Sequence, residues 1–250
     1  MKCPVCLKTD IQDLVYSQGY YRCNSCGYWF KDLTAFDYSF YNRDYWFKDD
    51  EILPIYQKMF YVFFENFILF DDVRYIIEFG AADGDFLWHV KNGFLMKGCM
   101  NVSYYYNDIK DLFRKKNEVF FSNSRDRFKK EIGKFEDVSI ELCGRGAERA
   151  FSNVFMIDVI EHIRVDIYKI FDQVYDLLCN GGKFHVVTTN GDHLYAQQEF
   201  IYHQEHLRAL TKKSVNIILK NLRKGGIYFK LEKLWEHPQG LLFLVFRRCK

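Results

Sequence analysis

Four cysteines near the N-terminus have the spacing of a metal site. They form two Cys-x-x-Cys pairs, Cys3 with Cys6 and Cys23 with Cys26, on either side of a segment that reads as a short hairpin (residues 7–22). Each pair can direct two thiolates at one point, and two pairs complete the tetrahedral sulfur shell that zinc takes in structural sites. The alternatives are four unrelated thiols or a redox pair, and a redox pair needs a thioredoxin-like setting that this sequence does not show. We therefore expect one structural zinc ion, bound by Cys3, Cys6, Cys23 and Cys26.

A second set of residues that can do chemistry lies in the stretch EFGAADGD, from Glu78 to Asp85, between an apolar segment and a helix-like one. In an open α/β sheet, the first strand-to-helix turn needs small residues so that the backbone can approach a ligand. The carboxylates of this stretch would repel a pyrophosphate, whereas a cationic amino-acid sulfonium is compatible with them. The pattern therefore favours S-adenosylmethionine over a dinucleotide. The alternative is a tight turn without a ligand.

Three histidines in the second half of the chain, His162, His203 and His206, are candidate general bases. If the ligand is a sulfonium that donates a methyl group, the transfer needs alignment of the reactants, and a hydroxyl or acidic carbon acceptor also needs a base. Histidine suits that role because its pKa lies near neutral pH. Each of the three has the alternative of a surface or hydrogen-bonded core histidine. His203 and His206 would share one face if their segment is helical, so they could divide binding and base roles.

The composition of the chain limits its possible partners. Its 250 residues are 49% hydrophobic and 27% charged, which is enough for one sizeable core and a small appendage. A net charge of +2 gives no strong attraction to nucleic acid or to anionic membranes. No secretory signal pattern opens the sequence, and the most apolar run, FYVFFENFILF, is short for a bilayer span. We expect a cytoplasmic protein whose partner is a small polar molecule.

The elements that must position these residues alternate between strands and helices. Strands are expected in VRYIIEF, NVSYYYND, FSNVFMID and GGKFHVVTTN, in DVSIEL, and in IYFKLEKLW and GLLFLVFRR near the C-terminus. The clearest helices are RVDIYKIFDQVYDLLC, ended by Gly181 or Gly182, and TKKSVNIILKNLRK, with Thr211 as cap and Gly225 as stop. Alternating strands and helices predict a Rossmann-like, doubly wound, mainly parallel α/β sheet.

We divide the chain into three parts: a zinc ribbon over residues 1–32, an aromatic connector and helix over 33–71, and a Rossmann-like domain over 72–250. From Asp50 to about Phe70 apolar residues recur at helical spacing, and Pro54 fits the first turn of a helix. Because this helix is apolar nearly all round, we expect it to pack between the ribbon and the main domain. A substrate lid is the alternative.

Two motifs together, IIEFGAADGDFL and MIDVIEHI, resemble the class I S-adenosylmethionine-dependent methyltransferases. The likeness is to the branch whose first motif reads E/D-x-G-x-G-x-G and whose fourth strand ends in D-V-x-E-H, and it covers the chain from about Asp72 onward. It implies that Asp108, with Asn107 as its rival, holds the ribose hydroxyls of the cofactor. Ala82 stands where the middle glycine is usual, and its extra methyl group should be tolerated if the backbone angle there is ordinary. The cofactor-binding residues that the resemblance implies are Glu78, Gly80, Ala82, Gly84, Asp108 and Asp158.

The N-terminal pattern YRCNSCGYWF, followed by FYNRDYWF, looks like the zinc-ribbon head and connector of methyltransferases from sugar-nucleotide and surface-polysaccharide pathways. The segment YHQEHLRALTKKSV is similar to one that follows the fifth strand in that subgroup, and His206 best matches its recurring histidine. This resemblance implies methyl transfer to a small polar acceptor, such as a sugar nucleotide or a phosphorylated intermediate of capsule or lipopolysaccharide synthesis.

The rival hypothesis is a protein that modifies a macromolecule, or an inactive binding module, with the ribbon docking protein or nucleic acid. The near-neutral net charge counts against nucleic acid as the partner. Both motifs are intact, which counts against an inactive enzyme.

Overall fold

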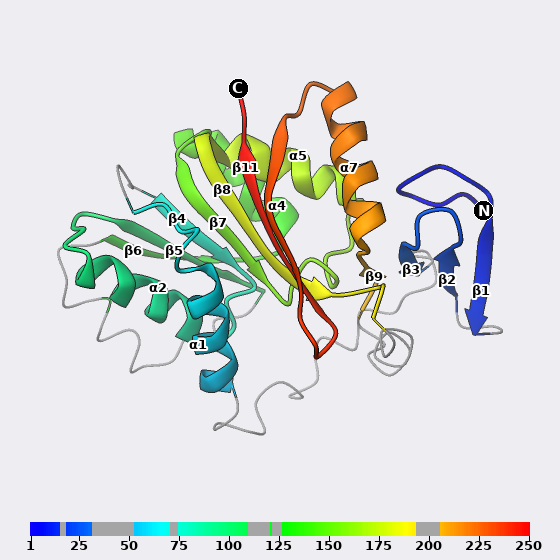
Figure 1. Cartoon of the computed structure of the whole chain (residues 1–250). Helices are drawn as coiled ribbons and strands as arrows, with labels where there is room; N and C mark the ends of the chain where they lie inside the picture. Colours follow the sequence, from blue (N-terminus) through cyan, green and yellow to red (C-terminus); the bar gives the residue numbers. More distant parts are fainter. Residues whose placement is uncertain (16–18, 32–52, 71–74, 110–120, 122–126, 194–205) are drawn as a thin grey trace.

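The structure, a computed structural model of the whole chain, describes residues 1–15, 19–31, 53–70, 75–109, 121, 127–193 and 206–250. Its main sheet has the strand order β10-β11-β8-β7-β4-β5-β6 (Figure 1). Neighbouring strands from β6 to β8 are parallel, whereas the β8–β11 and β11–β10 pairs are antiparallel. The predicted mainly parallel α/β sheet is confirmed. The strands are β4 (Tyr75–Phe79), β5 (Ser103–Asp108), β6 (Arg127–Ile132), β7 (Phe151–Ile157), β8 (Leu178–Thr189), β10 (Phe229–Glu236) and β11 (Leu241–Arg248).

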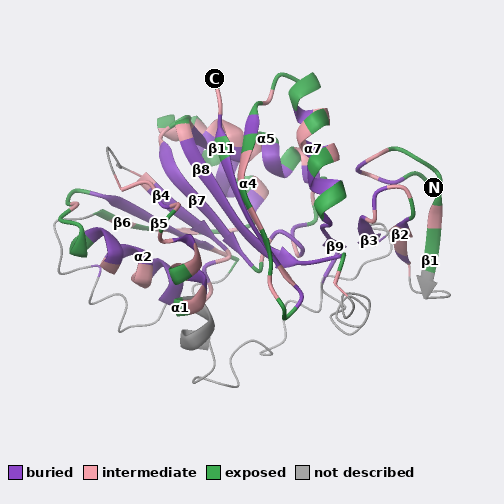
Figure 2. Cartoon of the chain, viewed as in Figure 1, coloured by how far each residue is buried: buried purple, intermediate pink, exposed green. Residues whose placement is uncertain are grey.

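Helices cover both faces of this sheet (Figures 1 and 2). Successive residues of a strand point to opposite faces, so Ile76 joins one buried cluster with α1 and α2, while Ile77 joins another with α4, α5 and α7. The central strands are buried on both sides, which explains why they read as continuous apolar runs rather than as alternating ones. The helices are α1 (Leu53–Phe64), α2 (Asp85–Met96), α4 (Phe135–Leu142) with the π-helical turn η3 (Cys143–Ala147), α5 (Ile167–Leu177) and α7 (Lys212–Lys224).

Helix α7 begins and ends where the sequence predicts. The hydroxyl of Thr211 accepts a hydrogen bond from the backbone N–H of Ser214 at 3.0 Å, and the Ser214 hydroxyl accepts one from the N–H of Thr211 at 2.8 Å. This reciprocal pair satisfies two N–H groups that have no partner within the helix. Gly225 follows the last turn as the C-cap.

Helix α1 occupies a different place from the one expected. Phe60 and Phe64 lie in the buried cluster on the α2 side of the sheet, and the ring of Phe63 stacks on Trp235 with centroids 5.1 Å apart. The ribbon residues belong to the opposite cluster, and Figure 1 places α1 far from them. The expectation that this helix packs between the ribbon and the main domain is therefore wrong, because its apolar surface covers the sheet.

The N-terminal strands form a second, four-stranded sheet of order β1-β2-β3-β9. Strand β9 belongs to the second half of the chain, and its Ala209 and Arg208 pair with Trp29 and Phe30 of β3. The ribbon therefore shares a sheet with a segment that leads into α7. Its strands are β1 (Ile11–Val15), β2 (Tyr20–Cys23), β3 (Trp29–Lys31) and β9 (Arg208–Ala209).

Two local predictions in the middle of the chain are wrong. The run DVSIEL lies in helix α4, where Val138 and Leu142 are buried one turn apart and Ile140 is exposed. The strand of this region is β6, a sheet edge with the polar sequence RFKKEI. Helix α5 ends at Leu177, and the glycines expected to stop it, Gly181 and Gly182, lie within β8.

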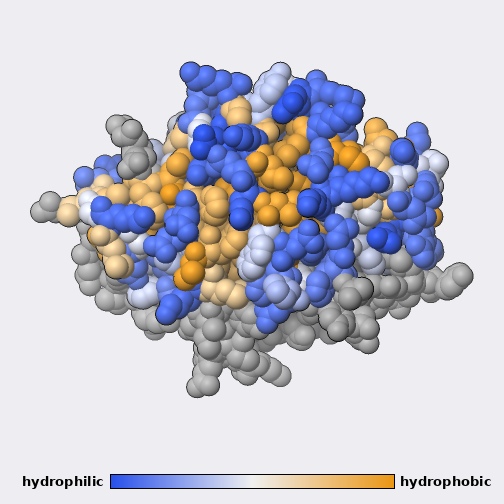
Figure 3. Space-filling model, in the orientation of Figure 1, coloured by the Kyte–Doolittle hydropathy of each residue, from blue (hydrophilic) through white to orange (hydrophobic). Residues whose placement is uncertain are grey.

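The surface that Figure 3 displays carries apolar side chains near its middle, with hydrophilic ones around them. None of the helices among the described residues has the length and hydrophobicity that a membrane crossing requires.

Candidate functional site

The strand order creates one place where a ligand is expected. From β4 the chain adds β5 and β6 on one side, and it then returns to place β7 and β8 on the other side. In open α/β sheets, ligands bind at the carboxyl ends of the strands beside such a reversal. Residues 80–84 follow β4 at this edge, Asp108 ends β5, and Asp158 follows β7.

The loop between β4 and α2 has a backbone that turns sharply. Gly80, Ala82 and Gly84 all have positive φ angles, of 65°, 45° and 79°. A Cβ atom on Gly80 would lie 2.4 Å from a methyl carbon of Val159, so only glycine fits there without movement. The backbone angle at Ala82 is not ordinary, so the condition for tolerating an alanine there is not met: this residue adopts the left-handed conformation, which costs an L-amino acid about 1–2 kcal/mol.

Hydrogen bonds from β5 hold this loop in place. The N–H of Ala82 donates to Oδ2 of Asp108 at 2.9 Å, and the hydroxyl of Tyr106 donates to the carbonyl of Ala82 at 2.7 Å. The carbonyl of Asn107 accepts from the N–H of Ala81 at 2.9 Å. These contacts place the Asp108 carboxylate beside the loop, at the edge where the ligand is expected.

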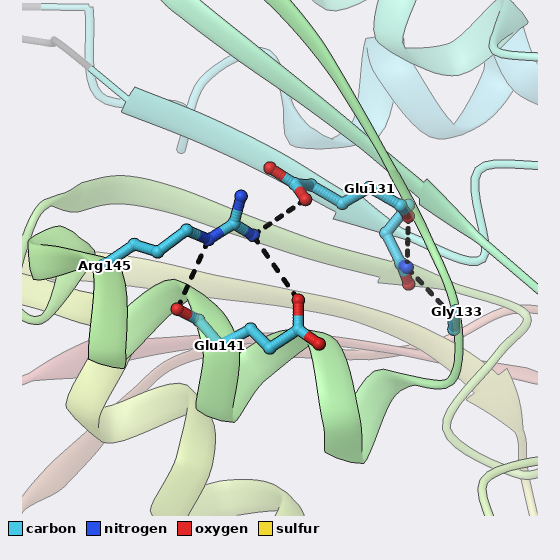
Figure 4. Close-up of polar contacts among 5 residues, drawn as sticks. Glu131, Gly133, Glu141 and Arg145 are labelled. Atoms are coloured by element: carbon cyan, nitrogen blue, oxygen red, sulfur yellow. Dashed lines mark hydrogen bonds and ion pairs between the residues drawn. The ribbon is translucent and has the colours of Figure 1, made fainter.

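The side chain of Asn107 lies on the β6 side of β5, away from this loop. Its amide donates to the carbonyls of Glu131 and Gly133, at 2.7 and 3.0 Å, where β6 turns toward α4 (Figure 4). Arg145 joins the same region, since its guanidinium lies 2.8 Å from the Glu131 carboxylate and 3.9 Å from that of Glu141. Of the two candidates for binding the ribose, the Asn107 side chain is therefore engaged in hydrogen bonds to backbone carbonyls, whereas the Asp108 carboxylate faces the loop.

Glu78 is a buried carboxyl with an unusual environment. Its side chain is only 2% exposed, and its Oε2 atom has no hydrogen-bond partner among the described residues. Burial raises its pKa well above the ordinary value, and the nearby carboxylates of Asp83, Asp108 and Asp85 raise it further. A cationic ligand group at this place would favour the charged form of Glu78.

A second group of polar side chains gathers where β7 and β8 end. The imidazole rings of His162 and His206 meet edge to face with centroids 4.8 Å apart, and Nδ1 of His206 lies 3.4 Å from the hydroxyl of Thr189. Glu161 is fully buried beside them, and one of its oxygens accepts from the N–H of Thr189 at 3.3 Å. Burial first, and then the charge of Asp158, raise the pKa of Glu161 well above its ordinary value.

The structure thus brings two of the three predicted histidines together, and His203 lies outside the described residues. Asp158 is exposed and left-handed, with φ 59°, and its N–H donates to the carbonyl of Val187 at 3.0 Å. Sequence reasoning missed the roles of Glu161 and Thr189. The motif D-V-I-E-H does contain Glu161 next to His162, and that adjacency was a usable signal.

The four N-terminal cysteines converge as their spacing predicts. Their sulfur atoms all lie within 4.8 Å of one another, with Cys3 and Cys26 at 3.6 Å and Cys6 and Cys23 at 3.4 Å. These separations are far too long for a disulfide, and they are close to the roughly 3.8 Å between sulfur ligands of one tetrahedral zinc. The thiols fit that metal.

The contact between Cys3 and Cys26 shifts the pKa values of these two thiols in opposite directions. The pKa of Cys3 is lowered to about 5, chiefly because the thiol of Cys26 hydrogen-bonds to it, while the pKa of Cys26 is raised by the same contact and by burial. Cys3 therefore favours the thiolate, whereas Cys26 favours the neutral thiol. Thiolate is the form that zinc binds.

Comparisons with known proteins agree on the fold. The plantazolicin methyltransferase BpumL, solved in complex with a monoazolic desmethylPZN analog and SAH, is similar with a TM-score of 0.55 and 13% identity over 81% of this chain and 87% of that one. A SAM-dependent methyltransferase from Archaeoglobus fulgidus gives a TM-score of 0.52 and 14% identity over 85% and 100%. The CurJ carbon methyltransferase gives a TM-score of 0.52 and 13% identity over 79% of this chain. This chain spans only 54% of the length of that protein.

No protein-family model matches the sequence, and no curated protein is similar enough to count as a relative. Identities this low show the fold and nothing finer. The chain has the Rossmann-like fold of the class I SAM-dependent methyltransferases, with a small four-cysteine sheet at its N-terminus.

Proposed function

We propose that this protein is an S-adenosylmethionine-dependent methyltransferase that acts on a small polar acceptor. The observation that carries the proposal is the glycine-rich, acidic loop after β4, which lies at the reversal of strand order beside the carboxyls of Glu78 and Asp108. The fold is compatible with this activity, since the similar solved structures include SAM-dependent methyltransferases.

Each element of the loop has a role toward the cofactor in this proposal. Gly80 and Gly84 let the backbone of the loop approach the methionine part, and the buried Glu78 lies close to its ammonium group. Asp108 binds the ribose hydroxyls through its carboxylate, which the N–H of Ala82 holds in orientation. A cofactor cation beside Glu78 accounts for a buried carboxyl that no cation of the loop itself neutralises.

The acceptor enters from the side of β7 and β8 in this proposal. Asp158 and the group formed by Glu161, His162 and His206 lie at the ends of these strands, where an acceptor would meet the methyl group. The proton of the acceptor is lost at this group, with His206 as the first candidate to take it and His162 beside it. A sugar nucleotide or a phosphorylated glycan intermediate is the acceptor class that the sequence resemblance suggests.

The zinc ion that we propose for Cys3, Cys6, Cys23 and Cys26 is structural. Four cysteine ligands leave zinc no open position for a substrate. The cluster also sits inside the packed core, where the hydroxyl of Thr211 donates to the carbonyl of Cys26 at 2.8 Å.

Calorimetric titration with S-adenosylmethionine and its demethylated product tests the cofactor assignment. We expect the wild type to bind both, and Asp108→Asn to bind them about 10-fold to 100-fold more weakly, since a hydrogen bond to a charged group is worth about 1.5–3 kcal/mol. The amide oxygen of the variant can still accept from Ala82, so the loop should keep its shape. Asp137→Asn, an exposed change in α4, is the matched control. Absence of binding by the wild type would refute the proposed function.

A further inference from the structure

We propose that Glu161, His162 and His206 bind one divalent transition-metal ion, in a site separate from the four-cysteine cluster. Each residue offers one ligand atom, and these atoms all lie within 4.8 Å of one another. Nitrogen and oxygen ligands bind such ions at about 2.1 Å, so two ligands of one ion are at most about 4.2 Å apart. Side-chain shifts of less than an ångström would therefore close the site around an ion.

The backbone around this group is fixed in a way that keeps the three side chains together. The N–H of Leu207 donates to the carbonyl of Glu161 at 2.7 Å, which ties the segment of His206 to the loop after β7. Within that loop, the N–H of His162 donates to the carbonyl of Val159 at 2.8 Å. Metal sites need such support, because ligands left mobile must be ordered when the ion binds.

An independent observation at Glu161 points to a cation. Its side chain is fully buried, and its Oε2 atom has no hydrogen-bond donor among the described residues. The other carboxylate oxygen accepts from the N–H of Thr189, so the side chain is held rather than mobile. Burying a carboxylate is costly unless it is paired or coordinates a metal. A metal ion between Glu161 and the two imidazoles would supply the missing partner.

The ligand types decide which ions fit. Two imidazoles and one carboxylate form the donor set of catalytic zinc sites and of non-haem iron(II) sites. Mg²⁺ and Ca²⁺ prefer oxygen ligands alone, so they fit less well. If Nδ1–H of His206 donates to the Thr189 hydroxyl 3.4 Å away, the lone pair of that ring is on Nε2, and a neighbour that fixes the tautomer in this way is usual for metal-binding histidines.

The site would act on the acceptor side of the reaction, and this part of the inference rests on the proposed function. Three protein ligands leave an open coordination position, which an oxygen of the acceptor can occupy. A metal ion lowers the pKa of an oxygen that it binds, so the acceptor can lose its proton to solvent water near neutral pH. With the ion bound, the two imidazoles hold the metal and no longer take the proton themselves. Exposed Asp158 and partly exposed His162 lie on the side from which the acceptor would come.

Cobalt(II) is a suitable probe, because its visible absorption reports the ligands. The full-length protein with zinc in its ribbon is titrated with Co²⁺ in equilibrium dialysis, and its spectrum is recorded. We expect one Co²⁺ per chain with bands typical of nitrogen and oxygen ligands. A sulfur-to-cobalt charge-transfer band would instead reveal exchange into the cysteine cluster, and binding of that kind alone would overturn the proposal.

Two variants and a control make the test specific. Glu161→Gln keeps an oxygen for the N–H of Thr189 but loses the negative charge, and His206→Asn removes one imidazole. Both should weaken Co²⁺ binding by more than about 100-fold, since even loss of a supporting partner costs 10-fold to 100-fold. His237→Asn, in the β10–β11 turn, should bind as the wild type does. Unchanged affinity in both site variants, with melting curves that show folded protein, would overturn the proposal.

Binding of S-adenosylmethionine by the same samples separates this inference from the proposed function. If Co²⁺ binds at these residues and the cofactor does not, the metal site stands and the proposed function fails. If the cofactor binds the wild type and Co²⁺ does not, the metal site is refuted and the methyltransferase assignment stands.

Discussion

The two cysteine turns of the ribbon and the loop after β4 are both tight turns for which we propose a ligand, but they are built in opposite ways. Each ribbon turn carries two of the proposed ligands, with two residues between them, and ends on a left-handed residue, Leu7 with φ 61° or Gly27 with φ 73°. The β4–α2 loop offers mainly backbone groups, held in place by Asp108 and Tyr106 of β5. The carboxyls that we assign to its ligand come from strands, Glu78 from β4 and Asp108 from β5.

This difference determines which binding sites can be predicted from the spacing of residues in the sequence. A site built within one turn shows its ligands in the local sequence, whereas a site built between strands depends on the order of the strands in the sheet. It also decides how each site fails. The ribbon should lose its structure when one ligand is removed, whereas the sheet edge should lose its ligand and keep its fold. Four predictions test this contrast.

The largest effect is expected for removal of a zinc ligand. In Cys23→Ser the ribbon should lose its metal and unfold locally, because the binding free energy of a structural zinc, about 10–16 kcal/mol in small peptides, is also folding free energy. Zinc analysis and amide hydrogen exchange would show this as loss of metal and of protection over residues 1–31.

The control for this change is Cys249→Ser, which replaces a cysteine far outside the cluster. We expect it to keep both zinc and protection. Strand β4 should stay protected in both variants, although some loss at β9 is expected because that strand pairs with β3. A ribbon that keeps its protection without zinc would contradict the prediction.

The next effect concerns Gly80 in the β4–α2 loop. Gly80→Ala should destabilise the protein by about 2–4 kcal/mol, because the positive φ angle is unfavourable for alanine and the new methyl group meets Val159. Val159→Ala in the same chain should recover the part that is due to the clash, and urea denaturation of the four proteins of this cycle measures the coupling. Additive effects would mean that the two residues do not touch.

Particular residues show how far the sequence could lead. The two Cys-x-x-Cys pairs and the caps of α7 follow from spacing, because the residues within each pair or cap are close along the chain. The wrong prediction of a strand near residue 135 has two physical causes. Strand β6 lies at the sheet edge and has mostly polar side chains, so it lacks the apolar pattern by which a strand is predicted. The spacing of Val138 and Leu142 fits one face of a strand as well as one face of a helix. The group around Glu161 depends on the contact with Leu207, which no local pattern contains.

The third prediction concerns the charge of Glu78. Its pKa in the folded protein is raised above the ordinary value of 4.5, so above about pH 4.5 the native state keeps a proton that the unfolded state has lost. Stability must then fall as pH rises through that window, by up to about 1.4 kcal/mol per pH unit for one group. Glu78→Gln lacks this dependence, so it should be more stable than the wild type by a margin that grows with pH.

Chemical denaturation between pH 5 and 8 measures that margin for Glu78→Gln, with the exposed change Glu236→Gln as control. The same variant should bind S-adenosylmethionine more weakly, because a neutral amide cannot pair with the ammonium group. Glu78→Gln would then lower cofactor affinity while raising stability. This would sharpen the contrast with the ribbon, where loss of a cysteine should lower both metal affinity and stability. A margin that does not change with pH would show that Glu78 is already ionised in the native protein.

The smallest effect is expected at Ala82, and it has the opposite sign to most mutations. The φ of 45° at Ala82 costs an alanine about 1–2 kcal/mol, and glycine would relieve this strain. Part of the relief, about 0.4–1 kcal/mol, is lost again because glycine gives the unfolded chain more conformational freedom. Ala82→Gly should therefore stabilise the protein by up to about 1 kcal/mol, or a few degrees in melting temperature. The backbone contacts to Asp108 and Tyr106 need no side chain, so they should persist and cofactor affinity should not fall. Ala81→Gly is the matched control: Ala81 is buried without a positive φ, and it should lose stability by a similar amount. If both changes destabilise the protein, Ala82 is not strained. The loop would then differ from the ribbon turns, although each has left-handed residues.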